Sequence, residues 1–320
     1  MHHFKTNPLQ SVSFLLACLL LTGCEHMGLS LDDFEIQTNP AIGYDEHASF
    51  LMGVIGPYKY DDYKDNGITI GFIYGKDPSL TDAREITGIP DEDRNIILKA
   101  EGLEEYTTYY YRVFARYKKD CIYGGTVSFK TLTFAAAEAI DLGLPSGTLW
   151  SSVNLGAGSP DEYGARYAWG ETEPKPRYLD SNYKWGDWLK FTKYCNNPEY
   201  GLNGFTDGKL ELEAQDDPAR QKLGGAWTIP SDADIREILN EAYIHWENAV
   251  QNGVKGFLAT SVANGNTIFI PDCDGSPYIS STLNAQACHV ALGFTDASSS
   301  VVIHSGAPRS QGSPIRPVKK

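Results

Sequence analysis

Leu103-Glu-Glu-Tyr-Thr-Thr-Tyr-Tyr-Tyr-Arg-Val-Phe-Ala115 is the most informative segment for the architecture of this 320-residue chain. Apolar residues occupy every second position of its second half, namely Tyr109, Tyr111, Val113 and Ala115. Successive side chains of a β-strand point to opposite faces of the sheet, so these four belong to one face. The segment therefore predicts a strand with one side in a hydrophobic core.

The segments on either side of it have a similar composition. They are short, rich in β-branched and aromatic residues, and separated by Gly, Asp, Asn and Pro. Evenly spaced strands without a convincing helix predict an all-β sandwich for residues 33–132. The predicted strands are Phe34–Thr38, Ala48–Ile55, Gly67–Tyr74, Asn95–Ala100, Thr107–Tyr117 and Gly125–Leu132.

The spacing from Leu103 to Tyr109, the alternation that follows it, and Ser128-Phe-Lys-Thr-Leu132 together resemble a fibronectin type III domain. The resemblance implies that Tyr109 is a corner tyrosine, whose hydroxyl ties back to the preceding loop. Another small sandwich is the alternative, and it leaves the expected role as a spacer or binding module unchanged.

Residues 1–23 have the features of an export signal. Residues 1–10 contain Lys5 and no acidic residue. Val12–Leu21 is almost wholly apolar but too short to cross a bilayer. Leu21-Thr-Gly-Cys24 then resembles the bacterial lipobox, in which the cysteine becomes the lipidated first residue of the mature chain. An ordinary signal peptide with a chance cysteine is the alternative.

The lipobox resemblance implies that Cys24 anchors the chain to a membrane, because two or more acyl chains bind a bilayer stably. Residues 24–32 then form a tether. Glu25 is not the aspartate associated with inner-membrane retention, so this analogy favours the outer membrane or cell surface, with the periplasmic face as the alternative.

The charge of the chain restricts its partners. It has 27 basic and 41 acidic residues, for a formal net charge of -14. A surface this acidic disfavours nucleic acid and anionic headgroups, and it favours solubility outside the cell.

Residues 133–138 are the predicted linker to a second region, 139–320. Here Ser231 is a suitable N-cap, and acidic residues follow in the first helical turn. An apolar stripe at helical spacing extends from Ile235 to Trp246, which predicts one long helix that ends near Gln251. A shorter helix is predicted at Pro218–Lys222 and a strand at Thr267–Ile270.

The second region also contains a series of ordered sequence blocks. They are Asp141-Leu-Gly-Leu-Pro-Ser-Gly-Thr-Leu-Trp150, Asn154-Leu-Gly-Ala157, Asp161-Glu-Tyr-Gly164, Tyr167-Ala-Trp-Gly-Glu-Thr172, Asp216-Asp217, Trp227-Thr-Ile-Pro-Ser231, Gly265-Asn-Thr-Ile-Phe-Ile-Pro271 and Ile315-Arg-Pro-Val318. This series resembles the Fibrobacter succinogenes major paralogous domain, which is abundant in lipoproteins of Bacteroidetes. The resemblance implies an α+β fold like that of C-type lectins and the formylglycine-generating enzyme. Tyr278-Ile-Ser-Ser281 departs from the family, which often has Tyr-Trp-Ser-Ser there.

Four cysteines remain once the signal and Cys24 are set aside, and no two of the chain's cysteines form a CxxC motif. Cys273 and Cys288 lie in one segment and are the favoured disulfide pair, although four cysteines allow three pairings or none. A zinc or redox motif is therefore not expected.

No catalytic residues are expected. The reactive cysteine pair of the sulfatase-modifying relatives has no counterpart that can be placed, and the GxSxG turn of serine hydrolases is absent. Asp272 and Asp274 are too few for a calcium loop. Asp216 and Asp217 fit a helix start better than a metal site. No metal or cofactor is expected.

Aromatic residues in a polar, turn-rich segment suggest a glycan-binding edge, because sugars stack on flat rings and rigid rings give contact area at little entropic cost. The alternative is that these rings pack as a lid over a loop-rich core, and Trp150, Trp169 and Trp227 of the blocks are expected in the core. The candidate ligand-binding residues are Tyr178, Tyr183, Trp185 and Trp188.

The sequence therefore predicts a non-enzymatic, membrane-anchored lipoprotein. The sandwich is expected to serve as a stalk, and the second region as a head that binds a glycan or a protein at the cell surface, as in adhesion. A structural subunit or tip component of a surface assembly is the alternative, and an enzyme of the formylglycine-generating-enzyme-like fold is a third possibility.

Overall fold

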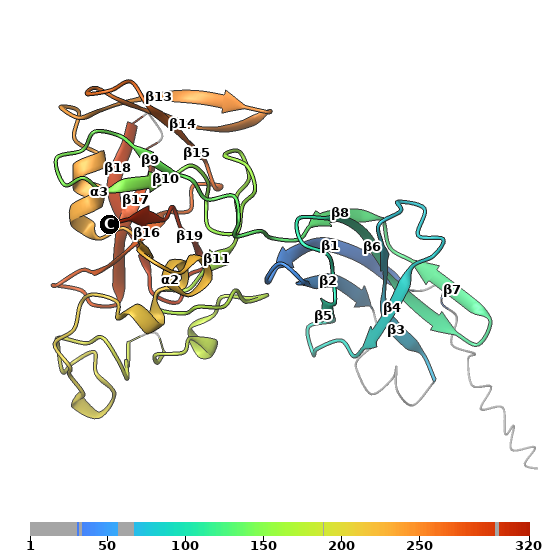
Figure 1. Cartoon of the computed structure of the whole chain (residues 1–320). Coiled ribbons are helices and arrows are strands. Elements are labelled where there is room, and N and C mark those ends of the chain that lie inside the picture. The colour runs from blue at the N-terminus through green and yellow to red at the C-terminus, as the bar shows by residue number, and fades with distance from the viewer. Residues whose placement is uncertain (1–30, 32–33, 57–66, 188, 298–300) are drawn as a thin grey trace, which may run out of the picture.

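A computed structural model describes residues 31, 34–56, 67–187, 189–297 and 301–320, and Figure 1 shows them as two lobes. Strands β1 to β8 form one lobe, and the later strands form the other together with the helices. The predicted signal peptide, Cys24 and Trp188 lie outside the described residues. No helix among those that are described is long and apolar enough to span a membrane.

The N-terminal lobe consists of antiparallel strands in two sheets. One sheet has the order β1-β2-β5, and the other has the order β4-β3-β6-β7, with β8 also paired to β6. The strands are β1 (Glu35–Gly43), β2 (Ala48–Gly56), β3 (Thr69–Gly75), β4 (Arg84–Gly88), β5 (Asn95–Glu101), β6 (Thr108–Tyr117), β7 (Asp120–Tyr123) and β8 (Val127–Lys130).

This arrangement confirms the predicted all-β sandwich. Leu51 and Ile96 from the first sheet share one hydrophobic cluster with Phe72, Tyr111 and Val113 from the second. Every predicted strand is present within a few residues of its expected bounds. Strands β4 and β7 were not predicted, because both are short and are mostly polar or exposed.

The expected corner tyrosine is also present. The backbone N–H of Glu104 donates to the hydroxyl of Tyr109 at 3.0 Å, and the Tyr109 ring stacks on Phe129 with 5.6 Å between the ring centroids. The ring is buried, so the hydroxyl holds the preceding loop against the sandwich.

We expect Tyr109→Phe to lower the free energy of unfolding of the sandwich by about 1 kcal/mol, because the Glu104 N–H loses its acceptor while the ring still packs. Scanning calorimetry of the full chain measures this change. Tyr123→Phe is the matched control, since Tyr123 is largely exposed. Equal stability of the wild type and Tyr109→Phe would show that the hydroxyl does not hold the loop.

The C-terminal lobe is built mostly of short antiparallel strands. Its sheets have the orders β12-β20-β10-β9, β11-β19, β13-β14-β15 and β16-β17-β18. The strands are β9 (Ala139–Asp141), β10 (Leu149–Ser151), β11 (Arg166–Tyr167), β12 (Trp227–Thr228), β13 (Ile244–Gln251), β14 (Val254–Ser261), β15 (Thr267–Pro271), β16 (Tyr278–Leu283), β17 (Val290–Ala297), β18 (Val301–Pro308), β19 (Ser313–Pro314) and β20 (Val318–Lys319).

Helices contribute little to this lobe. The described residues contain two α-helices of six and seven residues, together with three single-turn 3₁₀ segments. The predicted α+β C-type lectin-like fold is therefore not supported, because strands and irregular segments make up nearly all of the lobe. The helical elements are α2 (Pro218–Leu223), α3 (Asp232–Ile238), η2 (Asp180–Asn182), η3 (Leu202–Gly204) and η4 (Ala214–Asp216).

The predicted long helix is wrong beyond Ile238. Helix α3 ends there, Asn240 opens a turn, and the apolar stripe continues in β13 instead. Pairing of β13 with β14 over eight residues satisfies the backbone groups that the helix would have paired internally. Trp246 still meets the helix, because its indole N–H donates to the carbonyl of Ile238 at 2.9 Å.

The predicted helix starts are confirmed. At α3 the Ser231 hydroxyl accepts from the backbone N–H of Asp234 at 3.3 Å, and the Asp234 carboxylate accepts from the Ser231 N–H at 2.7 Å. This capping box satisfies two N–H groups that lack partners within the helix. At α2 Asp217 is the N-cap ahead of Pro218. The predicted strand at Thr267–Ile270 is present as β15.

Asp234 should make stability depend on pH. Burial alone would raise its pKa, but hydrogen bonds from Lys320 and Ser231 outweigh burial and hold the pKa below its ordinary value. A depressed carboxyl pKa contributes stability that is full above the unfolded pKa of about 4 and is lost as pH falls through the folded pKa.

Asp234→Asn should therefore be less stable at pH 7 by about 1 kcal/mol, and it should lose less stability than the wild type between about pH 5 and pH 2. Urea unfolding followed by tryptophan fluorescence measures both effects, since all six tryptophans lie after residue 139. Identical pH profiles for the two proteins would contradict the assignment.

Side chains from both lobes meet at the joint between them. The Tyr106 hydroxyl donates to Glu162 at 3.1 Å, Lys130 pairs with the same carboxylate at 2.9 Å, and Arg177 pairs with Asp91 at 3.0 Å. Leu132, just after β8, is buried in a hydrophobic cluster of the C-terminal lobe. These contacts hold the second lobe against one end of the sandwich.

Candidate functional site

The structure corrects the predicted aromatic ligand-binding edge. Tyr183 is only 6% exposed, and Tyr178 and Trp185 are partly buried against the same hydrophobic cluster. The Tyr183 hydroxyl donates to the carbonyl of Trp169 at 2.7 Å. The indole N–H of Trp185 donates to the carbonyl of Gly170 at 2.8 Å. The Tyr178 hydroxyl likewise donates to the carbonyl of Arg166 in β11. These three rings therefore close over the core and do not form an exposed row.

A buried arginine organises this part of the core. Arg309 is 1% exposed and donates to the Tyr183 hydroxyl at 3.0 Å, to the Tyr194 carbonyl at 3.1 Å and to the Lys193 carbonyl at 3.0 Å. Its guanidinium also lies 4.2 Å from the centroid of the Phe191 ring. No sequence pattern marks Arg309 as buried, because its partners lie more than a hundred residues away.

The other core assignments from the blocks are mostly confirmed. Trp150 and Trp169 are fully buried, whereas Trp227 is partly exposed. Asp216 is also buried, pairs with Lys193 at 2.6 Å, and therefore has a structural role. Among the described residues no group of three or more His, Cys, Asp or Glu side chains is arranged to hold a metal ion.

The structure also corrects the predicted pairing of Cys273 with Cys288. Both are free thiols, and they belong to different hydrophobic clusters. Cys273 lies beside the hydroxyl of Tyr278, with 3.3 Å between sulfur and oxygen. Cys288 instead faces Cys195, with 3.7 Å between the two sulfur atoms. Nearness in sequence suggested the wrong partner because β16 runs between the two cysteines of the predicted pair.

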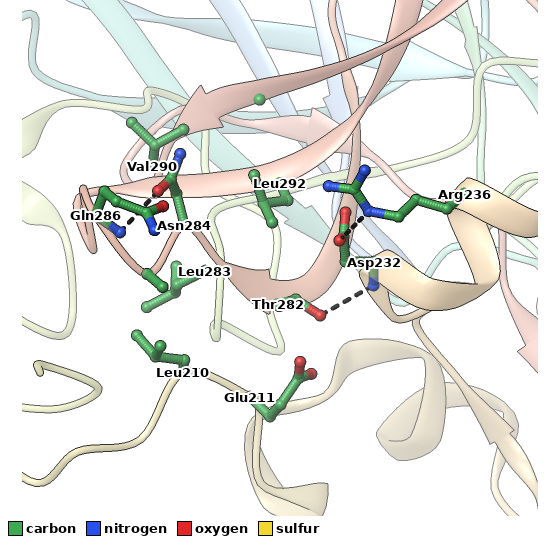
Figure 2. Close-up of a pocket in the computed structure, with 12 residues that line it drawn as sticks. Leu210, Glu211, Asp232, Arg236, Thr282, Leu283, Asn284, Gln286, Val290 and Leu292 are labelled. Carbon is green, nitrogen blue, oxygen red and sulfur yellow. Dashed lines mark hydrogen bonds and ion pairs between the residues drawn. The ribbon is translucent and has the colours of Figure 1, made fainter. Parts of the chain in front are cut away.

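A pocket of about 570 Å³ lies between segments that are far apart in the sequence. Figure 2 shows the first turn of α3 on one side of it, and the β16–β17 connection with the start of β17 on the other. A segment that precedes η4 closes a third side through a β-bridge between Glu211 and Thr282. The lining residues are Leu210, Glu211, Asp232, Arg236, Thr282, Leu283, Asn284, Ala285, Gln286, Val290, Leu292 and Gly306.

Aliphatic side chains form one part of the pocket wall. Leu210 and Leu283 lie next to each other in Figure 2, and Val290 and Leu292 extend this wall along β17. Leu283 is fully buried behind the surface, whereas the other three keep some exposure. The pocket can therefore remove part of an apolar ligand from water, which is worth about 25 cal/mol per Å².

Polar groups line the rest of the pocket. Arg236 pairs with Asp232 at 2.7 Å, and the backbone N–H of Asp232 donates to the Thr282 hydroxyl at 3.0 Å. The exposed Glu211 carboxylate accepts a hydrogen bond from the neutral hydroxyl of Ser281 at 3.0 Å. Because the lining has two carboxylates and one guanidinium, its net charge is negative.

The β16–β17 connection is held in a defined shape. The side-chain amide oxygen (Oδ1) of Asn284 accepts from the backbone N–H groups of Gln286, at 2.9 Å, and of Ala287, at 3.2 Å. Asn284 and Gln286 both lie at the rim of the pocket, as Figure 2 shows. The pocket is thus largely formed before a ligand binds, which lowers the entropic cost of binding.

The chemistry of this lining favours binding. None of its residues is aromatic, and none is a histidine or a cysteine. It therefore has neither the rings on which sugars stack nor a nucleophile beside a histidine base. Sequence analysis missed the pocket because its parts are contributed by residues 210–211, 232–236 and 282–306, which no local pattern connects.

The chain is similar over part of its length to solved structures. No protein-family model matches the chain, and no curated protein matches it. Among solved structures, it is similar to the sensor domain of the anti-sigma factor RsgI4 in Pseudobacteroides cellulosolvens (21% identity, TM-score 0.26, covering 32% of this chain and 99% of the other). It is also similar to a fibronectin type III domain derived from the human KIAA0970 protein (16% identity, TM-score 0.21, covering 31% and 73%).

Proposed function

We propose that this chain is a non-enzymatic binding protein, anchored to a membrane through lipid on Cys24, with its sandwich as a stalk. Its C-terminal lobe takes a protein segment into the pocket between α3 and the β16–β17 connection. The single observation that supports this proposal most strongly is the lining of that pocket, which combines a preformed aliphatic wall with a negatively charged rim.

The chemistry of the pocket specifies the ligand class. The aliphatic wall fits one Leu-sized or Phe-sized side chain, and a volume of about 570 Å³ exceeds what such a side chain needs. Glu211 at the rim favours a basic residue next to it, since attraction across a rim is strongest between opposite charges. A peptide with one large apolar residue next to Lys or Arg is the expected ligand.

Resemblances seen in the sequence alone also support this proposal. The lipobox and the blocks that resemble the Fibrobacter succinogenes major paralogous domain are typical of exported lipoproteins of Bacteroidetes. The resemblance of the sandwich to a fibronectin type III domain fits a spacer. Together they favour display at the outer membrane or cell surface, where a binding head meets its partners. Of the two ligand classes that the sequence suggested, the pocket favours protein over glycan.

Binding of full-length chain in mild detergent to a peptide array and a glycan array tests the proposal. The peptide array varies one apolar residue and one neighbouring basic residue. We expect capture of peptides that have both, with an affinity that falls as salt rises, because the charged rim contributes. Capture of glycans alone would show that the pocket has been assigned to the wrong ligand class.

Two variants locate the binding. Glu211→Arg reverses the rim charge and should weaken peptide binding about tenfold or more. Glu247→Arg makes the same charge change on exposed β13, away from the pocket, and should leave binding unchanged. Equal affinities of the two variants would show that peptides bind elsewhere on the chain.

A further inference from the structure

Cys195 and Cys288 face each other inside the C-terminal lobe. Their sulfur atoms are 3.7 Å apart although 93 residues separate them in the sequence, and the side chains are 0% and 1% exposed. Cys273 lies in another hydrophobic cluster, and Cys121 lies in the sandwich. We infer that Cys195 and Cys288 form a disulfide bond when the chain meets a small-molecule or protein disulfide oxidant.

The backbone on each side of this pair is already held in place. The Asp207 carboxylate accepts from the N–H groups of Tyr194 at 2.8 Å and of Cys195 at 2.9 Å. The Cys195 carbonyl in turn accepts from the N–H of Asp207 at 3.0 Å. The side-chain amide of Asn196 donates to the carbonyl of Ala285 at 2.8 Å, which ties the two cysteine segments together.

Because the segments are tied, the bond needs only a small movement. The two sulfur atoms must approach from 3.7 Å to the bond length of about 2.05 Å, which a change of side-chain rotamers and small backbone shifts can provide. To reach either sulfur, Cys273 would have to leave its own cluster and Cys121 would have to leave the sandwich. The tertiary structure therefore selects one of the possible pairings.

The chemistry is two successive thiol–disulfide exchanges. One protein thiolate attacks a sulfur of the oxidant RSSR, forms a mixed disulfide and releases RS⁻. The second protein thiolate then attacks the protein sulfur of that mixed disulfide and releases the other RS⁻. Two protein thiols are oxidised by two electrons, the oxidant is reduced to two RSH, and these take up the two protons.

The reaction should be slow in the folded chain. Burial, together with the neighbouring Cys195, raises the pKa of the Cys288 thiol to about 11, so the thiolate is scarce at neutral pH. Both thiols are also nearly closed to solvent. Oxidation during folding, when the sulfurs are accessible, should be much faster than oxidation of the finished fold.

The bond would also reinforce the pocket. Cys288 lies between Gln286 and Val290, which both line the pocket, whereas Cys195 lies in the loop that precedes η3. A bond between them would fasten the β16–β17 connection to that loop. It would restrict the unfolded chain by closing a long loop, which is the main source of disulfide stabilisation. This inference does not depend on the identity of the ligand.

The test uses the full-length chain with Cys18→Ser and Cys24→Ser, so that four thiols remain. The protein is refolded in mild detergent with oxidised or with reduced glutathione, and is then digested without reduction and analysed by mass spectrometry. We expect one cross-linked peptide pair that contains Cys195 and Cys288. Its mass should be lower than the sum of the two peptides by two hydrogen atoms, and a reductant should separate them.

Thermal unfolding gives a second measurement. The oxidised protein should have a Tm higher than the reduced protein by roughly 5 °C or more. Cys195→Ser and Cys288→Ser should each abolish the cross-link and the increase in Tm, while Cys273→Ser should retain both. Four free thiols after refolding in oxidised glutathione, or Cys273 in the cross-linked peptide, would show that the inference is wrong.

Discussion

Arg309→Ala is expected to lower the free energy of unfolding of the C-terminal lobe by about 4 kcal/mol. The side chain is fully buried, and it donates to the Tyr183 hydroxyl and to the carbonyls of Lys193 and Tyr194. Removing it leaves these acceptors without this donor, which costs roughly 1–3 kcal/mol for each buried group, and the bonds to Tyr183 and Tyr194 are the buried ones. It also leaves a void against the Phe191 ring.

Urea unfolding followed by tryptophan fluorescence measures the effect, because all six tryptophans belong to residues 139–320 of the sequence. Arg309→Lys should recover part of the loss, because an ammonium group can reach fewer acceptors than the planar guanidinium. Arg236→Ala is the control, since Arg236 is exposed and its pair with Asp232 is worth less than about 1 kcal/mol. Equal losses for Arg309→Ala and Arg236→Ala would show that Arg309 does not organise the core.

Trp169→Ala is the second substitution with a large expected effect, about 3–5 kcal/mol. Trp169 is 1% exposed, and its indole N–H donates to the carbonyl of Ser280 at 2.9 Å. Its ring meets Tyr194 edge to face, with 5.0 Å between centroids. The substitution therefore removes a large apolar surface, an aromatic contact and a hydrogen bond to β16 together.

The same unfolding experiment separates these contributions. Trp169→Phe keeps most of the apolar surface and should cost about 1–3 kcal/mol, mainly because the Ser280 carbonyl loses its donor. Trp246→Phe is the comparison, since that ring is partly exposed, although its indole N–H also donates to a backbone carbonyl. A smaller loss for Trp169→Ala than for Trp246→Phe would contradict the placement of Trp169 in the core.

Local patterns were sufficient for the sandwich. The alternation from Tyr109 to Ala115 placed four side chains in the core, and all four are buried in β6. This prediction did not need the strand order, because the alternation of side chains between the two faces is a property of a single strand. The same holds for the helix starts, where Ser231 and Asp217 cap their helices through contacts within three residues. Interactions of this range can be predicted from sequence.

Local patterns failed where pairing with another segment of the chain competed with them. The stripe from Ile235 to Trp246 suits a helix, but β14 offered a full set of hydrogen bonds to its second half. Tyr183 and Trp185 lie in a polar segment, yet carbonyls of the Trp169–Gly170 turn accept from both. In each case, hydrogen bonds to a neighbouring segment of the chain outweighed a preference of less than about 1 kcal/mol per residue.

The composition and order of residues were therefore enough to establish the acidic charge, six of the eight strands of the sandwich, its corner tyrosine and the beginnings of both helices. Only the tertiary structure placed Cys195 against Cys288, buried Arg309, and brought Glu211, Arg236 and Leu292 to one pocket. The physical reason is the range of the interactions. Capping and alternation act between residues close in the chain, whereas the pocket and the cysteine pair exist only after distant segments have packed together.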